Sequence, residues 1–364
     1  RKLVDLDAPL SKILPDYPNG ERLTLHQLLL HTSGIPDINT QPVYAELSRS
    51  HRTPAELVAA FENLPLLFEP GARFHYSNSN YNLLAFVIER VSGMSYGDFL
   101  RREIFEPLGL RHTGHADSDG TIVPNRAEGY VPVGRSGLAR APWIDWSVKT
   151  GNGSLYSTAA DLANWVRSFF KGGLLDPDTL SLAITPRLED IGIDTMRGDL
   201  SYVWSIGRLL GREKVWYAGR SPGFSGAVSY FPEEDLTIVV LSNTYSLATT
   251  KAADAIAAMA FGEPYEAEHV DDTPLPPEAV KRWVGTYQFG DRAPVPNMKM
   301  RVVEDGGRLT LEPELEQMGP SALLPAGDGT FILRSYWMQL KFIAKPNAPA
   351  EALTLFGARA ERIE

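Results

Sequence analysis

The sequence contains no cysteine among its 364 residues. This absence excludes thiol nucleophiles, disulfide bonds and metal sites built on cysteine. Covalent chemistry would therefore fall to serine, threonine or lysine. Positive charge is also in deficit, because 35 Lys and Arg stand against 45 Asp and Glu, a formal net charge of −10. Nucleic acids and anionic membranes attract a basic face, so we expect neither as a partner.

Long apolar runs are missing as well, since no stretch approaches the ~20 residues that a membrane-spanning helix needs. The opening RKLVDLD has none of the features of a signal peptide and does not decide the compartment. What is present is 43% hydrophobic and 10% aromatic content, enough for a large core. Length and composition together predict a globular protein of two folding units.

Helix signals dominate the first part of the chain. Thr24 and Thr53 are positioned as N-caps, and Pro54 follows the second of them. Helices are expected over residues 24–33, 53–63, 81–93, 95–105 and 251–261, and from residue 158 onward. Residues 111–150 are rich in Gly, Pro and Asp and are expected to form a long surface excursion. Strands over 226–231 and 236–241 predict an antiparallel hairpin.

The composition changes over residues 262–279, where acidic residues and proline replace periodicity. We interpret this stretch as a linker between a first domain, residues 1–261, and a second domain, residues 280–364. The second domain consists of short apolar runs separated by turn residues. That spacing predicts a small all-β barrel or sandwich.

One Ser-x-x-Lys motif, Ser168 to Lys171, would place a hydroxyl and an amine one helical turn apart. The apolar stripe of that helix consists of Leu162, Trp165, Val166 and Phe169. Ser168 and Lys171 lie off this stripe, toward water. A nucleophile requires a desolvated cleft, so we interpret the pair as solvated surface.

The triplet Lys149-Thr150-Gly151 matches one that lines the active site of penicillin-recognising enzymes from a β-strand. Only a Gly-rich turn and two residues separate it from the helix start at Thr158, which leaves little room for a strand. We interpret it as a coincidence in a loop. Tyr217-Ala218-Gly219-Arg220 has a better context, a strand whose glycine permits close approach of a substrate.

These motifs occur in a recognisable order together with Tyr76-x-Asn78. The segments that carry the resemblance are KLVDLDAPLSKILPDYP, LTLHQLLLHTSGIP, FEPGARFHYSNSNYNLLAFVIERVSGMSYGDFLRREIFEPLGL, GNGSLYSTAADLANW and GRSPGFSGAVSYFPEEDLTIVVLSN. Over most of residues 1–260 the chain resembles the serine β-lactamase/penicillin-binding-protein superfamily, and within it the class C β-lactamase-like branch of esterases and D-aminopeptidases. The part from about residue 280 resembles the lipocalin-like barrel domain of some members.

The resemblance implies an α+β fold of the β-lactamase/transpeptidase type, an antiparallel sheet flanked by helices, followed by a small all-β barrel. It implies that Tyr76 shuttles a proton and that Asn78 binds the substrate amide or a lysine. Tyr217 and Gly219 would line the substrate strand, and the backbone amide of Arg220 would donate to the oxyanion. Neither a cofactor nor a metal is expected.

The chain departs from the family pattern in two ways. Tyr217 stands where the family usually has Lys or His, which removes a cation suited to a substrate carboxylate. The Ser-x-x-Lys nucleophile should lie upstream of RKLVDLDAP, together with two strands that pair with the hairpin over 226–241. We therefore expect the chain to be the larger part of a protein whose N-terminal segment is carried elsewhere, because its sheet edge would otherwise be exposed.

The histidines suggest no further site. His31 follows a helix, and we interpret it as a cap for that helix beside Thr32 and Ser33. His75, His112, His115 and His269 have no metal-ligand spacing.

The sequence thus predicts a metal-independent serine hydrolase or acyltransferase that acts on a small ester, amide or D-amino-acid peptide. A true β-lactamase and a non-catalytic binder of peptide or peptidoglycan are the alternatives. We expect a periplasmic or secreted location rather than a cytoplasmic one.

Overall fold

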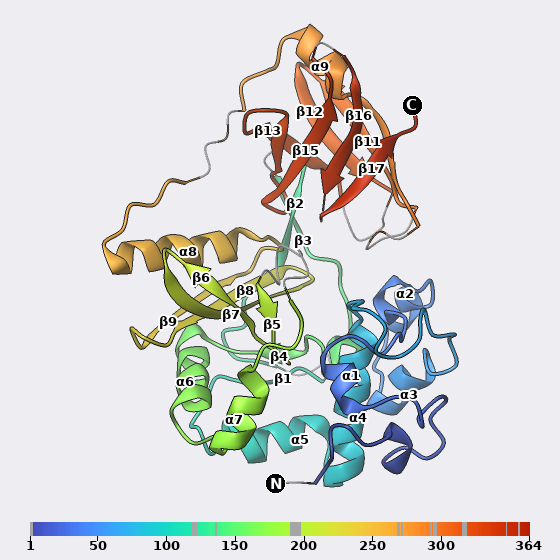
Figure 1. The fold of residues 1–364 in the computed structure, drawn as a ribbon, viewed down its shortest axis with the longest axis vertical. Helices are drawn as coiled ribbons and strands as arrows, with labels where there is room; N and C mark the ends of the chain where they lie inside the picture. Colours follow the sequence, from blue (N-terminus) through green and yellow to red (C-terminus); the bar gives the residue numbers. More distant parts are fainter. Residues whose placement is uncertain are drawn as a thin grey trace.

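The computed structural model describes residues 3–117, 122–134, 137–189, 198–267, 270, 272–291, 293, 297–314, 319–346, 348–355 and 357–364. The described residues form a helical region, a five-stranded antiparallel sheet and a closed eight-stranded barrel (Figure 1). The β-lactamase-like arrangement of helices around an antiparallel sheet agrees with the expected fold class. For the second domain the sequence predicted either a barrel or a sandwich. The structure shows a closed barrel.

The helical region comprises η1 (Leu10–Lys12), α1 (Leu25–Leu29), η2 (Ile38–Thr40), α2 (Tyr44–Leu47), α3 (Pro54–Ala59) and α4 (Asn78–Ser92). Thr24 and Thr53 form capping boxes at α1 and α3, as the sequence indicated. Helix α4 ends at Gly93, which has a φ of 70° that glycine adopts without strain. It begins three residues earlier than expected, so Asn78 lies in its first turn.

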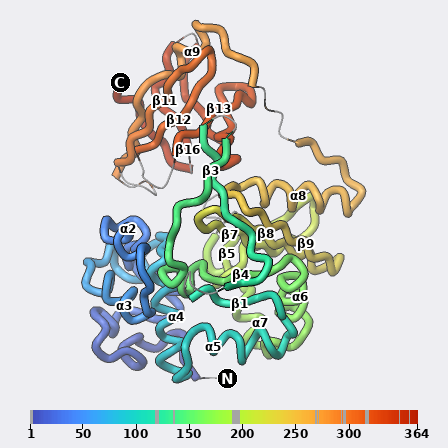
Figure 2. The backbone as a smooth tube through the Cα atoms, turned by 180° about the vertical axis from the view of Figure 1, so that it is seen from behind, coloured from blue at the N-terminus to red at the C-terminus, as the bar shows by residue number. Residues whose placement is uncertain are grey.

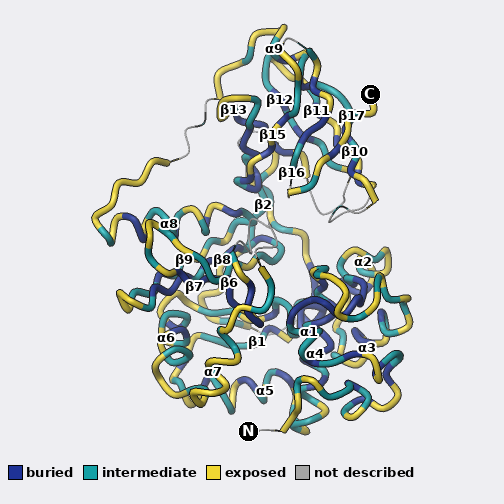
Figure 3. Tube along the Cα trace, viewed as in Figure 1, coloured by how far each residue is buried: buried dark blue, intermediate teal, exposed yellow. Residues whose placement is uncertain are grey.

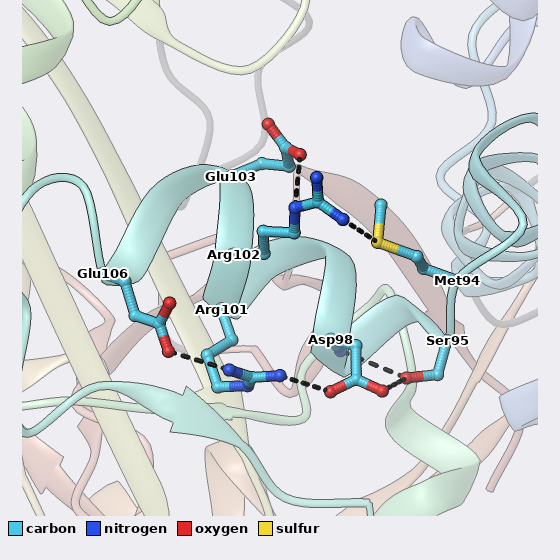
Figure 4. A network of polar contacts seen from close by, with 7 residues as sticks. All are labelled: Met94, Ser95, Asp98, Arg101, Arg102, Glu103 and Glu106. Atoms are coloured by element: carbon cyan, nitrogen blue, oxygen red, sulfur yellow. Dashed lines mark hydrogen bonds and ion pairs between the residues drawn. The ribbon is translucent and has the colours of Figure 1, made fainter.

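Helix α5 (Tyr96–Leu100) continues into a π-helical turn, η3 (Arg101–Phe105). Ser95 caps α5 by accepting a hydrogen bond from the backbone of Asp98. On the exposed side, Arg101 bonds to Asp98 at 2.9 Å and to Glu106 at 2.8 Å (Figure 4). These ion pairs are solvent-exposed and each stabilises the fold by about 1 kcal/mol at most.

The sheet runs in the order β5 (Asp199–Leu200), β6 (Ser205–Leu209), β7 (Arg212–Ser221), β8 (Phe224–Phe231) and β9 (Leu236–Ser242). The expected hairpin is the pair β8 and β9. Helix α8 (Ala248–Phe261) packs Ala253 and Ala257 against Phe231 on one face. Helix α6 (Ala159–Phe170) packs Val166 near Trp204 on the other, and α7 (Pro177–Ile184) follows it. Helix α8 thus covers one face of the sheet, and helix α6 covers the other.

Residues 111–150 contain more structure than a surface excursion. Strand β1 (Gly114–His115) pairs with β4 (Leu155–Tyr156), and η4 (Trp146–Lys149) precedes β4. The hairpin of β2 (Tyr130–Val133) and β3 (Gly137–Arg140) extends toward the barrel (Figure 2). There Gly134 forms a parallel bridge to Ser321, so the two parts of the chain are in contact.

The barrel follows α9 (Pro277–Trp283). Its strands are β10 (Gly285–Phe289), β11 (Lys299–Asp305), β12 (Arg308–Pro313), β13 (Ser321–Pro325), β14 (Thr330–Leu333), β15 (Met338–Ala344), β16 (Ala350–Leu355) and β17 (Ala358–Arg362). Strand β17 pairs with β10 and closes the barrel. Leu247, from the start of α8, packs into the barrel core, and its backbone N–H donates to the Tyr336 carbonyl at 2.8 Å.

The segment that leaves α8 is exposed from residue 262 to residue 267 (Figure 3). Helix α9 begins inside the stretch that we interpreted as a linker. Among the described residues, no helix is long and apolar enough to span a membrane.

Candidate active site

Tyr76 lies directly before helix α4 and faces strand β7. Its phenol lies close enough to that of Tyr217 to affect its pKa, so the two tyrosines singled out in the sequence are neighbours. The nearby Tyr217, together with burial and the charge of Asp37, raises the pKa of the Tyr76 phenol well above its ordinary value. Such a phenol is no base at neutral pH unless a cation beside it lowers that pKa.

His31 holds the ring of Tyr76 in place. Its φ of 55° ends the turn after α1, but its ring lies between Tyr76, at 4.3 Å between ring centroids, and Tyr81, at 5.1 Å. The Nδ1 atom accepts a hydrogen bond from the Ser77 backbone at 3.2 Å. Burial lowers the pKa of His31 to about 3, so the ring is neutral at ordinary pH. The expected cap is therefore wrong for the ring, which supports the loop that carries Tyr76.

Asn78 faces an aspartate rather than open space. Its Nδ2 donates to Asp37 Oδ2 at 2.9 Å, and its backbone N–H donates to Asp37 Oδ1 at 3.2 Å. Asp37 Oδ1 also accepts from the Asn39 backbone at 3.0 Å. Burial raises the pKa of Asp37, while these hydrogen bonds and the charge of Lys149 oppose that effect. Asp37 thereby fixes the first turn of α4 and orients Asn78.

Strand β7 carries the other predicted site residues. It pairs with β6 only as far as Trp216, so residues 217–221 have β8 on one side and no strand of the described residues on the other. A Cβ at Gly219 would meet nothing within 4 Å, which marks open space beside Tyr217. The Arg220 guanidinium lies 5.3 Å from the centre of the Tyr245 ring.

The two remaining motifs, Ser168 to Lys171 and Lys149 to Gly151, lie in different surroundings. The Lys171 ammonium is paired with Asp235 at 2.7 Å on the surface, so it is not a base for Ser168. Lys149 lies at the end of η4, not in a strand, which agrees with the loop interpretation. It is nevertheless buried, at 8% exposure, and lies close enough to Asp37 to interact with its charge. Dismissing the triplet therefore overlooked a lysine beside the site.

His31, Asp37 and Lys149 are the residues of this region that sequence reasoning missed or misjudged. Asp37 and Asn78 are 41 positions apart, and no spacing rule connects them. Within the described part of the chain, no three His, Asp or Glu side chains are arranged to hold a metal ion. His269, one of the four histidines considered for metal binding, lies outside the described residues.

Comparison with known proteins places the chain in a family. The family model for Beta-lactamase matches residues 1–262. Penicillin-binding protein 4* of Bacillus subtilis is 28% identical over 377 residues, which cover 93% of this chain and 77% of that protein. The chain spans 54% of one further curated relative and 37% of another.

Two solved structures are similar as well. The octameric penicillin-binding protein homologue from Pyrococcus abyssi has a TM-score of 0.62 at 24% identity, over 98% of this chain and 82% of that one, and it shows the shared fold. A D-stereospecific amidohydrolase from Streptomyces has a TM-score of 0.62 at 26% identity, over 72% of this chain and 81% of that one. With its matching family model, this chain belongs to the serine β-lactamase/penicillin-binding-protein superfamily.

Proposed function

We propose that this chain is the larger part of a serine hydrolase or acyltransferase that works through an acyl-enzyme. A serine Oγ attacks the carbonyl carbon of the substrate, and the bond to the leaving amine or alcohol breaks. Tyr76 takes the proton from the serine and passes it to the leaving group. The observation that carries the proposal is the proximity of Tyr76 to Tyr217 on strand β7, next to the open space at Gly219.

The nucleophile belongs, in this proposal, to a Ser-x-x-Lys segment that precedes Arg1. The proposed proton transfer needs a cation beside Tyr76, and the lysine of such a motif would supply it. Strand β9 supports it too, since its outer edge has no partner strand among the described residues. An unpaired apolar edge is a site for further strands.

The substrate class that we propose is a small amide, ester or peptide of a D-amino acid. The Streptomyces relative, 26% identical, is described as a D-stereospecific amidohydrolase, and penicillin-binding protein 4* matches nearly the whole chain. The backbone amide of Arg220 would stabilise the oxyanion, a role that needs geometry rather than a particular side chain. We further propose that the first domain is of the class C-like branch and that the barrel is its lipocalin-like domain.

The test is kinetic and uses the protein with the residues encoded upstream of Arg1. D-phenylalanine amide and L-phenylalanine amide are compared as substrates, with p-nitrophenyl acetate as a simple ester. We expect turnover of the D-amide to exceed that of the L-amide. Rapid turnover of nitrocefin with slow ester hydrolysis would instead indicate a β-lactamase. Binding of the D-amide without turnover of any of the four would indicate a non-catalytic binder.

A further inference from the structure

A cavity of about 360 Å³ lies where strands β6 and β7, helix α8 and the barrel meet. Lys214 and Trp216 line it from β7, Asp254 lines it from α8, and Trp337 lines it from the turn between β14 and β15. Side chains alternate along a strand, so Lys214 and Trp216 project from the face of β7 opposite to that of Tyr217. Small-molecule sites of this size are common where two domains meet.

A glycine leaves open the space beside Lys214. Gly207 on β6 is the direct cross-strand partner of Lys214, so their side-chain positions share one face of the sheet. A Cβ at Gly207 would meet only the Cα atom of Gly198, at 3.9 Å, within 4 Å. A larger side chain at position 207 would therefore fit the strand and occupy part of the cavity.

Trp337 lines the cavity from a strained backbone position. Its φ is 54°, a conformation that glycine adopts readily and that is an outlier for a bulky residue. Such residues persist where the surrounding structure holds them, and they cluster at ligand sites. Trp216 lines the same cavity, so two indoles are available to a ligand. Indole rings favour contact with a flat apolar body.

The charged groups that line the cavity are mostly positive. Lys214 is buried, at 5% exposure, and its ammonium pairs with Asp254 and lies 4.7 Å from the centre of the Trp216 ring. An ammonium has three N–H donors, and no other described residue accepts a hydrogen bond from this one. Arg208 and Lys251, both exposed, line the cavity as well. Three cations thus face one carboxylate in a chain with a net charge of −10.

We propose that this cavity is a ligand site for a small aromatic carboxylate. The ring of the ligand packs against the indoles of Trp216 and Trp337, and its carboxylate accepts a hydrogen bond from the Lys214 ammonium. Arg208 and Lys251 attract the anion electrostatically. The site is separate from the tyrosine pair, because it lies on the other face of β7, and it does not depend on the nucleophile of the proposed hydrolase.

The test measures binding of 2-naphthoate and of neutral 2-naphthamide to the full chain by calorimetry. We expect the acid to bind about ten-fold more tightly, the scale of one charge-assisted hydrogen bond. Gly207→Val fills the cavity and Trp337→Gly removes one wall while relieving the backbone, so each should weaken naphthoate binding at least about ten-fold. Leu210→Gly is the matched control, because Leu210 has a φ of 51° and is exposed outside the cavity. It should bind naphthoate as before.

A double variant tests the charge. Lys214→Met with Asp254→Asn removes the ion pair without leaving one buried charge alone, and it should abolish the preference for the acid. The control changes an exposed pair on the barrel, Lys345→Met with Glu351→Gln, and should keep the preference. Circular dichroism confirms that each variant is folded. No heat of binding with naphthoate, or unaltered binding in a folded cavity variant, would overturn the proposal.

Discussion

The imidazole of His31 lies against the phenol of Tyr76, with ring centroids 4.3 Å apart and ring planes inclined by 32°. The same imidazole accepts the backbone N–H of Ser77, the residue next to Tyr76. One neutral ring therefore fixes both the side chain and the backbone at the centre of the proposed site. His31 therefore contributes to this site by positioning Tyr76, not by transferring a proton.

Replacing His31 by Phe keeps an aromatic ring between the tyrosines but removes the acceptor for Ser77. A buried N–H without a partner costs roughly 1–3 kcal/mol. We expect the free energy of unfolding in urea to fall by that amount. The matched control is His51→Phe at an exposed position, which should change little. Equal stability of both variants would show that the Ser77 hydrogen bond is unimportant.

His31 also predicts a dependence of stability on pH. Its pKa is about 3 in the folded protein and about 6.5 in the unfolded chain, so only the unfolded chain binds the proton between these values. The contribution of His31 is therefore full above pH 6.5 and is lost as the pH falls toward 3, by at most ~1.4 kcal/mol per pH unit. Unfolding curves of the unaltered chain and of His31→Phe should converge as the pH falls. A constant difference from pH 7 to pH 4 would contradict the low pKa.

Asp37→Ala tests the anchor of helix α4. It removes the acceptor of three N–H groups, two of them from Asn78. Hydrogen bonds to a charged group are worth roughly 1.5–3 kcal/mol each, and burial of the carboxylate offsets part of this. We expect a loss of about 2 kcal/mol in unfolding free energy, measured against the exposed control Asp178→Ala. A variant as stable as the control would show that Asp37 does not anchor the helix.

Tyr76→Phe removes the hydroxyl and keeps the ring that packs on His31. In the protein with its upstream segment, kcat should fall by roughly 10²–10⁴ with little change in substrate binding, because proton transfer is lost. Tyr81→Phe is the matched control, since the Tyr81 hydroxyl bonds to the backbone carbonyls of Leu29 and Tyr202. If kcat is unaltered in Tyr76→Phe, Tyr76 lines the pocket but takes no part in proton transfer.

Tyr217→Lys restores the cation that the family pattern places on this strand. In the same complete protein we expect it to raise kcat/KM for substrates with a carboxylate next to the scissile bond. The expected gain in transition-state stabilisation is roughly 1–2 kcal/mol. The comparison uses kcat/KM for an acid and its methyl ester on both variants. If the ratio does not change, residue 217 does not face the carboxylate of the substrate.

Local sequence signals were sufficient to predict much of the fold. The caps at Thr24, Thr53 and Thr158 are fixed by hydrogen bonds within a few residues, so sequence patterns reveal them. Barrel closure depends on β17 pairing with β10 across the whole domain, which no local pattern encodes. The site divides in the same way. The resemblance assigned Tyr76 and Tyr217 to one site because their motifs occur in the family order. The positions of Asp37 and Lys149 depend instead on contacts between distant parts of the chain and on burial.

Intact-mass spectrometry after treatment with a fluorophosphonate probe tests the account most directly. The protein is produced with the residues encoded upstream of Arg1, and the modified residue is located by peptide mapping. We predict one adduct per chain, on the serine of an upstream Ser-x-x-Lys motif, and none on Ser168. An adduct on Ser168, or a protein that turns over substrate with no adduct on any upstream serine, would contradict the account.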